Sequence, residues 1–175
     1  MRKGLFFVIL LPMKLEALFK VNESKLFWAK DNSPADAASF EKICIKWSEV
    51  ELDDEVYNEE FLAKLRDQLK ELDSANKFAI LVPEIDRTYE TPAHKEAFTT
   101  AMNHTARRVK DCVSVAGFLL PSDLLKEGLS AGKPAVDFMD TLAIKHAQYV
   151  YFASKSDIDT FNLTEDISKY PVVML

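Results

Sequence analysis

The sequence predicts an α/β fold in which mostly parallel strands alternate with helices. Short apolar runs without polar alternation recur along the 175 residues, and strands of that kind are typically buried on both faces of a parallel sheet. Amphipathic stretches with helical spacing separate the runs, and this alternation indicates parallel strands joined by right-handed crossovers. The predicted strands are residues 4–10, 42–47, 77–82, 113–120, 147–153 and 171–175.

The N-terminal stretch "MRKGLFFVILLP" has a basic start followed by an apolar run, which resembles a short signal peptide. The apolar run, residues 5–11, is too short to span a bilayer, and no small-x-small cleavage site follows it closely. We therefore expect a first buried strand, no membrane span and a cytoplasmic protein, with a secreted protein as the alternative if the run is a signal. After it, a helix is predicted around residues 14–20 and a short strand at residues 25–29.

Each later helix is predicted from a start signal. Asn58 is a favoured N-cap for residues 59–75, in which apolar residues recur at helical spacing. Thr91 with Pro92, and Pro134 farther on, open two more amphipathic helices. Shorter helices are predicted over residues 35–43, after Ser33 and Pro34, and over residues 157–163, with Ser156 as the cap.

The length favours a single α/β domain spanning residues 1–175. Its sheet either curves as a shortened TIM-barrel-like sheet or stays open as a doubly wound, flavodoxin-like sheet. No glycine-rich phosphate loop follows any predicted strand, so a dinucleotide is not expected, and no other cofactor is predicted.

Composition narrows the classes of ligand. The net charge is −6, from 22 Lys and Arg against 28 Asp and Glu, which does not favour binding to nucleic acid. The two cysteines, Cys44 and Cys112, are expected to be buried free thiols, with a disulfide as the alternative. The three histidines fall on predicted helices without a second ligand at metal spacing, so no metal site is predicted: His94, His104 and His146.

Three segments resemble part of a known enzyme family. They are "CIKWSEVELDDEVYNEEFLAKLRDQLKEL", "KFAILVPEID" and "ETPAHKEAFTTAMNHTARRVKDCVSVAGFLLPSD". They resemble the second to fourth strands, with their helices, of the clan A glycoside hydrolases, especially the cellulase-like family 5. The fourth strand of that family has the pattern G-F-x-L-x-N-E-P. Counting from Gly117, the resemblance places Ser122 at the family's Asn and Asp123 at its acid/base Glu.

Two departures from the family pattern bear on catalysis. Asp123 is one methylene shorter than Glu, and a displacement of about an ångström can cost roughly 100-fold in rate. A retaining glycosidase also needs a second carboxylate roughly 5–5.5 Å from the first. In the family this nucleophile follows the seventh strand, whereas the present sequence ends after about its sixth predicted strand.

The candidate acidic residues each have two interpretations. Asp123 is either a general acid or, with Ser122, the N-cap of the helix start "SDLLKE". Glu84 and Asp86 follow the third strand of the resemblance, where the sites of (β/α) proteins form. They are either ligand-binding carboxylates or part of a solvated loop paired with Arg87.

The two candidate aromatic residues also have two interpretations each. Trp47, followed by Ser48, ends the second strand and either stacks on a sugar ring or fills the top of the core. Tyr89 lies in the loop after the third strand and is either a sugar-binding group or an exposed loop residue. The expected substrate-binding set is Trp47, Glu84, Asp86, Tyr89 and Ser122.

From these observations we expect a glycoside-hydrolase-like protein that binds a carbohydrate or protein partner through its strand-end loops without catalysis. One alternative is an active glycoside hydrolase that uses Asp123 as acid/base, with a second carboxylate from Glu84, Asp86 or a neighbouring subunit. Another is a flavodoxin-like regulatory or interaction module. The sequence leaves open whether the protein is an enzyme. Because a short barrel has exposed sheet edges, a homo-oligomer is also expected.

Overall fold

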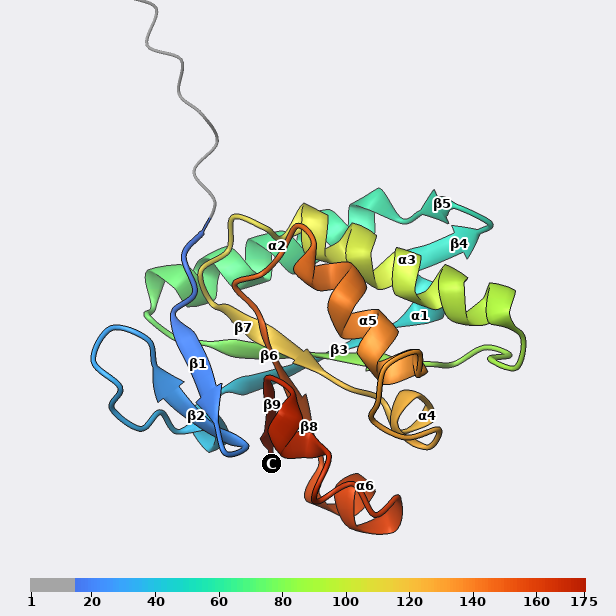
Figure 1. The fold of residues 1–175 in the computed structure, drawn as a ribbon. Coiled ribbons are helices and arrows are strands. Elements are labelled where there is room, and N and C mark those ends of the chain that lie inside the picture. The colour runs from blue at the N-terminus through green and yellow to red at the C-terminus, as the bar shows by residue number, and fades with distance from the viewer. Residues whose placement is uncertain (1–14) are drawn as a thin grey trace, which may run out of the picture.

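A five-stranded sheet, parallel throughout, forms the centre of the protein, whose computed structural model describes residues 15–175 (Figure 1). The predicted α/β fold with mostly parallel strands is confirmed. The predicted strand at residues 4–10 lies outside the described residues, and the other five predicted strands each contribute one strand of the sheet. In spatial order these are β3 (Glu41–Lys46), β6 (Ala79–Glu84), β7 (Val115–Leu119), β8 (Val150–Ala153) and β9 (Val172–Met174).

The strands follow one another in space in the order of the chain. This is the order of consecutive strands in a (β/α) barrel, and within residues 15–175 it has no reversal of the kind that defines a doubly wound sheet. The sheet stays open in this part of the chain, with β3 and β9 at its edges. Because crossovers between parallel strands are right-handed as a rule, this order sends the connecting helices to the same face.

That face is covered by α2 (Glu59–Ser74), α3 (Pro92–Arg108) and α5 (Pro134–Ala143) (Figure 1). Their apolar sides pack on one set of alternate strand residues in a single buried cluster. The start signals are confirmed: the Asn58 side chain accepts from the Phe61 N–H, and Thr91 forms a capping box with His94 ahead of Pro92. The cluster includes Ile45, Leu81, Phe118 and Tyr151 from the sheet, and Leu65, Leu69, Phe98, Met102, Phe138 and Leu142 from the helices.

A β-hairpin of β1 (Phe19–Asn22) and β2 (Lys25–Trp28) lies on the opposite face of the sheet. The short strand predicted at residues 25–29 is confirmed, but the helix predicted around residues 14–20 is wrong. Residues 19–22 alternate apolar and polar side chains, and Glu23 and Ser24 both have positive φ (47° and 60°), which is the geometry of a two-residue hairpin turn. The apolar side of the hairpin packs on Ile80, Ala116, Val150, Phe152 and Val173.

Two short predicted helices differ in the structure. Residues 35–43 form only a 3-10 turn (Ala37–Ser39), because the apolar residues that follow it pair with β6 as part of β3. The predicted helix at residues 157–163 is α6 (Lys155–Thr160), and its cap is Ser154 rather than Ser156. Ser154 is three residues ahead of Asp157, so its hydroxyl reaches the Asp157 N–H. The remaining elements are α1 (Trp47–Val50), β4 (Glu51–Asp53), β5 (Val56–Tyr57), α4 (Ser122–Leu125) and a 3-10 turn (Ile167–Lys169).

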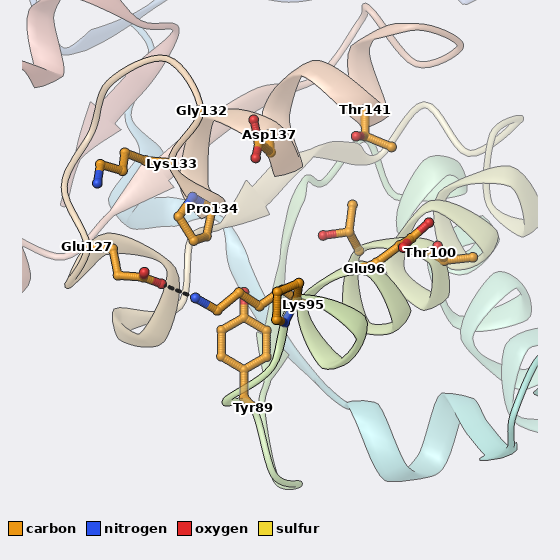
Figure 2. A pocket seen from close by; sticks show the side chains of 12 residues that line it. Tyr89, Lys95, Glu96, Thr100, Glu127, Gly132, Lys133, Pro134, Asp137 and Thr141 are labelled. Atoms are coloured by element: carbon orange, nitrogen blue, oxygen red, sulfur yellow. Dashed lines mark hydrogen bonds and ion pairs between the residues drawn. The ribbon is translucent and has the colours of Figure 1, made fainter.

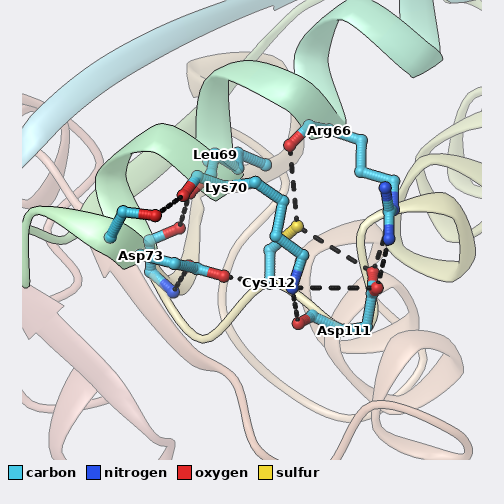
Figure 3. A network of polar contacts seen from close by, with 8 residues as sticks. Arg66, Leu69, Lys70, Asp73, Asp111 and Cys112 are labelled. Atoms are coloured by element: carbon cyan, nitrogen blue, oxygen red, sulfur yellow. Dashed lines mark hydrogen bonds and ion pairs between the residues drawn. The ribbon is translucent and has the colours of Figure 1, made fainter.

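A polar network fastens α2 to the loop that leads into β7 (Figure 3). Asp111 pairs with Arg66 (Oδ2···Nη2 2.5 Å), and Asp73 accepts from the Ser114 N–H at 2.7 Å. Cys112 lies buried in this network, and burial raises the pKa of its thiol to about 11. Both cysteines are free, but Cys44 is exposed on edge strand β3, so the expectation that it is buried is wrong.

Within residues 15–175, no helix has the length and apolar character that crossing a membrane requires.

Gly117 allows β7 and β8 to pair closely, because a Cβ at this position would overlap the carbonyl group of Val150. We therefore predict that Gly117→Ala lowers the free energy of unfolding by about 3 kcal/mol or more, since a backbone group cannot move aside cheaply. Gly128→Ala is the control. At Gly128 nothing lies within 4 Å, and only the φ of +102° opposes a side chain, so we expect a loss of about 1–2 kcal/mol. If urea unfolding gave equal losses of free energy for the two variants, the close approach of Gly117 to Val150 would be contradicted.

Candidate functional site

The parallel strands bring the predicted site residues to one edge of the sheet. Each predicted residue lies at, or shortly after, the carboxyl end of β3, β6 or β7. Carboxyl ends of parallel strands share an edge, which is where the sites of (β/α) proteins form. Trp47 opens α1 after β3, Glu84 ends β6 and precedes Asp86 and Tyr89, and Ser122 and Asp123 open α4 after β7.

Asp86 is held by Ser48, which lies just beyond the neighbouring strand. Its carboxylate accepts hydrogen bonds from the Ser48 backbone N–H (N···O 3.0 Å) and from the Ser48 hydroxyl. Burial raises the pKa of Asp86, but these hydrogen bonds, with a smaller contribution from Arg87, outweigh it and hold the pKa below its ordinary value. Asp86 is therefore an ionised clamp between the ends of β3 and β6.

Glu84 and Arg87 have partners of their own. Glu84 accepts a hydrogen bond from the Cys44 thiol, with Sγ 3.2 Å from Oε2. Arg87 lies against Glu51, with Nη1 3.6 Å from Oε1, and its guanidinium donates to the Glu51 backbone carbonyl. Burial raises the pKa of Glu51, while the Trp47 indole N–H and Arg87 oppose that rise. The loop after β6 is thus tied to the segment after β3.

Trp47 and Tyr89 are both buried. Trp47 is 3% exposed, and its ring packs edge-on against Phe98 with centroids 5.6 Å apart. Of the two alternatives for Trp47, the structure has the one in which the indole fills the core. Tyr89 is 8% exposed rather than at the surface, and its ring also packs edge-on against Phe98.

Ser122 and Asp123 do not cap α4. The helix begins at Ser122, after Pro121, without a side-chain cap hydrogen bond. The Ser122 hydroxyl instead donates to Asp157 at 2.8 Å, and the Asp123 carboxylate contacts Lys126 Nζ at 3.1 Å. Asp123 has a 45% exposed side chain and does not line the pocket described next.

A pocket of about 470 Å³ lies between the N-terminal ends of α3 and α5 (Figure 2). Lys95 crosses it to pair with Glu127, with Nζ 2.5 Å from Oε2, and lies over the Tyr89 ring, 5.9 Å from its centroid. The charged or hydroxyl-bearing residues of its lining are Tyr89, Lys95, Glu96, Thr99, Thr100, Glu127, Lys133, Asp137 and Thr141.

The Tyr89 hydroxyl is the unusual group of this pocket. It is buried and has no hydrogen-bond partner within residues 15–175. Burial, and next the carboxylates of Glu127 and Asp123, raise the pKa of Tyr89 far above its ordinary value, so the phenol keeps its proton. A buried hydroxyl without a partner costs free energy that a ligand group could recover.

Sequence reasoning missed most of this pocket. Lys95 and Glu96 lie in the first turns of α3, Asp137 in the first turn of α5, and Glu127 in the loop between α4 and α5. One signal could have indicated them: Pro92 and Pro134 open helices that follow neighbouring parallel strands, so their first turns meet at the same edge. Among the described residues, no three His, Cys, Asp or Glu side chains are grouped closely enough to hold a metal ion.

The chain was compared with protein families, curated proteins and solved structures. No family model matches the sequence, and no curated protein matches it. Among solved structures, the chain is similar to a GH5_18 protein from Bifidobacterium longum subsp. infantis, at 12% identity and a TM-score of 0.48. The alignment covers 67% of this chain and 34% of that one, so the match spans about a third of the neighbour. This neighbour belongs to the family that the motifs resemble, but similarity at this level does not establish a shared fold or activity.

The Asp86 clamp predicts an acid-dependent contribution to stability. Asp86→Asn is expected to lower the free energy of unfolding by about 1–3 kcal/mol at pH 7, because it replaces a charged acceptor of two hydrogen bonds. The pKa of Asp86 is lower in the folded protein than its ordinary 3.8, so its contribution is complete above that value and is lost as the pH falls through the folded pKa.

Urea unfolding at pH 7 and at pH 3 measures the difference in the free energy of unfolding between the unmodified protein and Asp86→Asn. This difference should be smaller at pH 3. Asp67→Asn is the matched control, because Asp67 is exposed on α2 and makes no side-chain hydrogen bond or ion pair in the described part of the chain. If the two variants were equally stable at pH 7, the clamp would be contradicted.

Proposed function

We propose that the protein is a non-catalytic binding protein whose pocket between α3 and α5 takes a small carbohydrate. The observation that carries this proposal is the buried Tyr89 hydroxyl, which has no partner and adjoins a pocket rich in hydrogen-bonding groups. The volume of about 470 Å³ lies within the roughly 300–1,000 Å³ usual for small-molecule sites.

The chemistry of the lining supports a polyhydroxylated ligand. Each sugar hydroxyl both donates and accepts a hydrogen bond. The pocket offers acceptors in Glu96 and Asp137, a donor in Lys133, and hydroxyls such as that of Thr141 that do either. The ammonium of Lys95 and the carboxylate of Glu127 already pair with each other, so charge alone does not dominate recognition.

The surroundings of the predicted acids support binding rather than cleavage. Hydrolysis of a glycosidic bond needs two carboxylates that face each other across the substrate. Asp123 is exposed, contacts Lys126 and lies outside the pocket, and Asp86 is an ionised clamp on Ser48. Neither is placed as the sheltered acid that family resemblance would require.

The Tyr89 hydroxyl allows binding to be separated from stability. We expect Tyr89→Phe to raise the free energy of unfolding by about 1 kcal/mol, because it removes a buried hydroxyl without a partner. The same change should weaken sugar binding about five- to tenfold, because the ligand loses a hydrogen bond. Thermal unfolding and calorimetry with the best binder from a carbohydrate array measure the two effects.

Matched variants complete this experiment. Tyr149→Phe removes another phenolic hydroxyl that is buried outside the pocket, and it should leave sugar affinity unchanged. Asp137→Ala should weaken binding, whereas Asp67→Ala, also an exposed aspartate on a helix, should not. Absence of binding to any sugar at millimolar concentration would refute the proposal. Turnover of aryl glycosides that is lost in Asp123→Asn would favour the enzyme instead.

Self-association is a separate proposal that rests on the open edge of the sheet. The outer side of β3 has no strand neighbour in residues 15–175 and is free to pair with another chain. Its exposed Glu41, Lys42 and Lys46 weaken such pairing, since charges on edge strands discourage it, so we expect association to depend on protein concentration. We expect light scattering to give a mass above the 19.9 kDa of one chain. A monomer at every concentration would contradict this proposal.

A further inference from the structure

A second, smaller pocket lies toward the C-terminal ends of α3 and α5, at the other end of the same pair of helices. Its volume is about 190 Å³, below the roughly 300 Å³ at which pockets for drug-sized ligands begin. It is lined by Tyr57 of β5, by the second half of α3, and by Lys145 and His146, which follow α5. The two pockets share Thr100 and no other lining residue.

The small pocket is positively charged, although the whole chain carries a net charge of −6. Arg107 and Lys145 line the pocket. Lys110 lies close enough to lower the pKa of His146, whose imidazole also lines it. None of these three cations has a carboxylate within ion-pair distance in residues 15–175, whereas neighbouring Arg66 and Arg108 are both paired.

Arg107 is held in place by a relay of side chains. His104 Nε2 lies 2.9 Å from Glu59 Oε1, and His104 Nδ1 lies 2.8 Å from Arg107 Nη2. Burial lowers the pKa of His104 despite the hydrogen bond to Glu59, so the neutral ring donates to Glu59 and accepts from Arg107. Tyr57 stacks on the imidazole at 3.9 Å. The guanidinium is thus oriented before any ligand arrives.

Two polar groups of this pocket have no partner. His146 is 4% exposed, and its imidazole makes no hydrogen bond in the described residues. Asn103 Oδ1 is buried and unpartnered as well. Cations near helix C-termini are favourable in themselves, which accounts for where Arg107 and Lys145 lie. It does not account for the buried Asn103 Oδ1 without a partner, or for an imidazole that lines the same pocket without a hydrogen bond.

We propose that this pocket binds the phosphoryl group of a small soluble molecule. Arg107 and Lys145 supply charge-assisted donors, and the His146 N–H supplies a third. Asn103 Oδ1 accepts from a hydroxyl of the ligand. Several cations around one pocket match a group that has three acceptor oxygens and a charge of about −1.5 to −2 better than they match a carboxylate with a single charge. This proposal does not depend on the carbohydrate site.

Titration with inorganic phosphate at pH 7 and constant ionic strength tests the proposal. We expect saturable changes in the NMR signals of the His146 ring. Arg107→Gln with Lys145→Gln should weaken the apparent affinity at least about tenfold, because two charge-assisted contacts are lost. Both side chains are exposed, so the fold should survive, which a melting curve without phosphate checks. Lys20→Gln with Lys42→Gln is the control: it removes the same charge from exposed strand positions and should leave the affinity unchanged.

The titration of His146 gives an independent readout. The charged groups that act on it are Lys145, its neighbour in the chain, Arg107 of α3 and Lys110 just after α3, and Tyr149 stacks against its ring. Burial and these cations lower its pKa, so a bound anion should raise it again. A pKa that does not move at saturating phosphate would overturn the assignment.

Two further arms identify the source of the phosphoryl group. Glycerol phosphate bound at least as tightly as phosphate would support a soluble ligand. Binding to phosphatidic-acid vesicles without binding to glycerol phosphate would overturn it in favour of a lipid. Equal shifts of the His146 signals with phosphate, acetate and chloride would show that the anions only screen charge. Unchanged phosphate affinity in the variant with Arg107→Gln and Lys145→Gln would likewise overturn the proposed site.

Discussion

Parallel pairing of five strands in chain order sets where the helices, the strand ends and both pockets lie. Crossovers between parallel strands are right-handed as a rule, and in this order they place α2, α3 and α5 on one face, while parallel pairing places every strand exit on one edge. It also makes α3 and α5 neighbours that run in the same direction. The groove between them therefore has two chemically different ends, one at the helix N-termini and one at the C-termini, and a pocket lies at each.

The same strand order leaves the second face of the sheet without helices. In a closed barrel that face points inward and is filled by side chains from the other strands. Here the β1–β2 hairpin covers it, with β1 against β8 and β2 against β9. Phe19 is central to this layer, with its ring 4.6 Å from Trp28 and 5.0 Å from Phe78. A barrel-like strand order is thus compatible with a protein that buries both faces of an open sheet.

Buried polar groups fall into two sets with different consequences. Those satisfied within the chain join elements to one another: Asp86 with Ser48 between strand ends, and Asp73 with Ser114 between α2 and β7. Among those without a partner, the Tyr89 hydroxyl lies at one pocket and Asn103 Oδ1 at the other. The first set stabilises the framework, while the second leaves hydrogen-bonding capacity that a ligand can use.

Elements whose signals are local could be predicted from the residues alone. Strand runs such as residues 77–82, and helices such as the one capped by Asn58, depend on periodicity and on side chains a few residues apart. Of the hairpin at residues 19–28, only the second strand was predicted. The first was missed, because the turn at Glu23 and Ser24 lacks the usual glycine or asparagine and the apolar residues before it also suit a helix. The edge that collects Glu84, Asp86 and Asp123 was predictable from strand exits alone.

The contacts of those residues could not be predicted from local signals. The hydrogen-bonded pairs are far apart in the sequence. Their separations are 38 residues for Asp86 and Ser48, 32 for Lys95 and Glu127, and 45 for His104 and Glu59. Such pairs depend on how far each helix is rotated and shifted on the sheet, and that is set by the packing of the whole core. The pockets therefore lie where packed helices leave space, while the motif residues at the strand ends serve largely to join neighbouring segments.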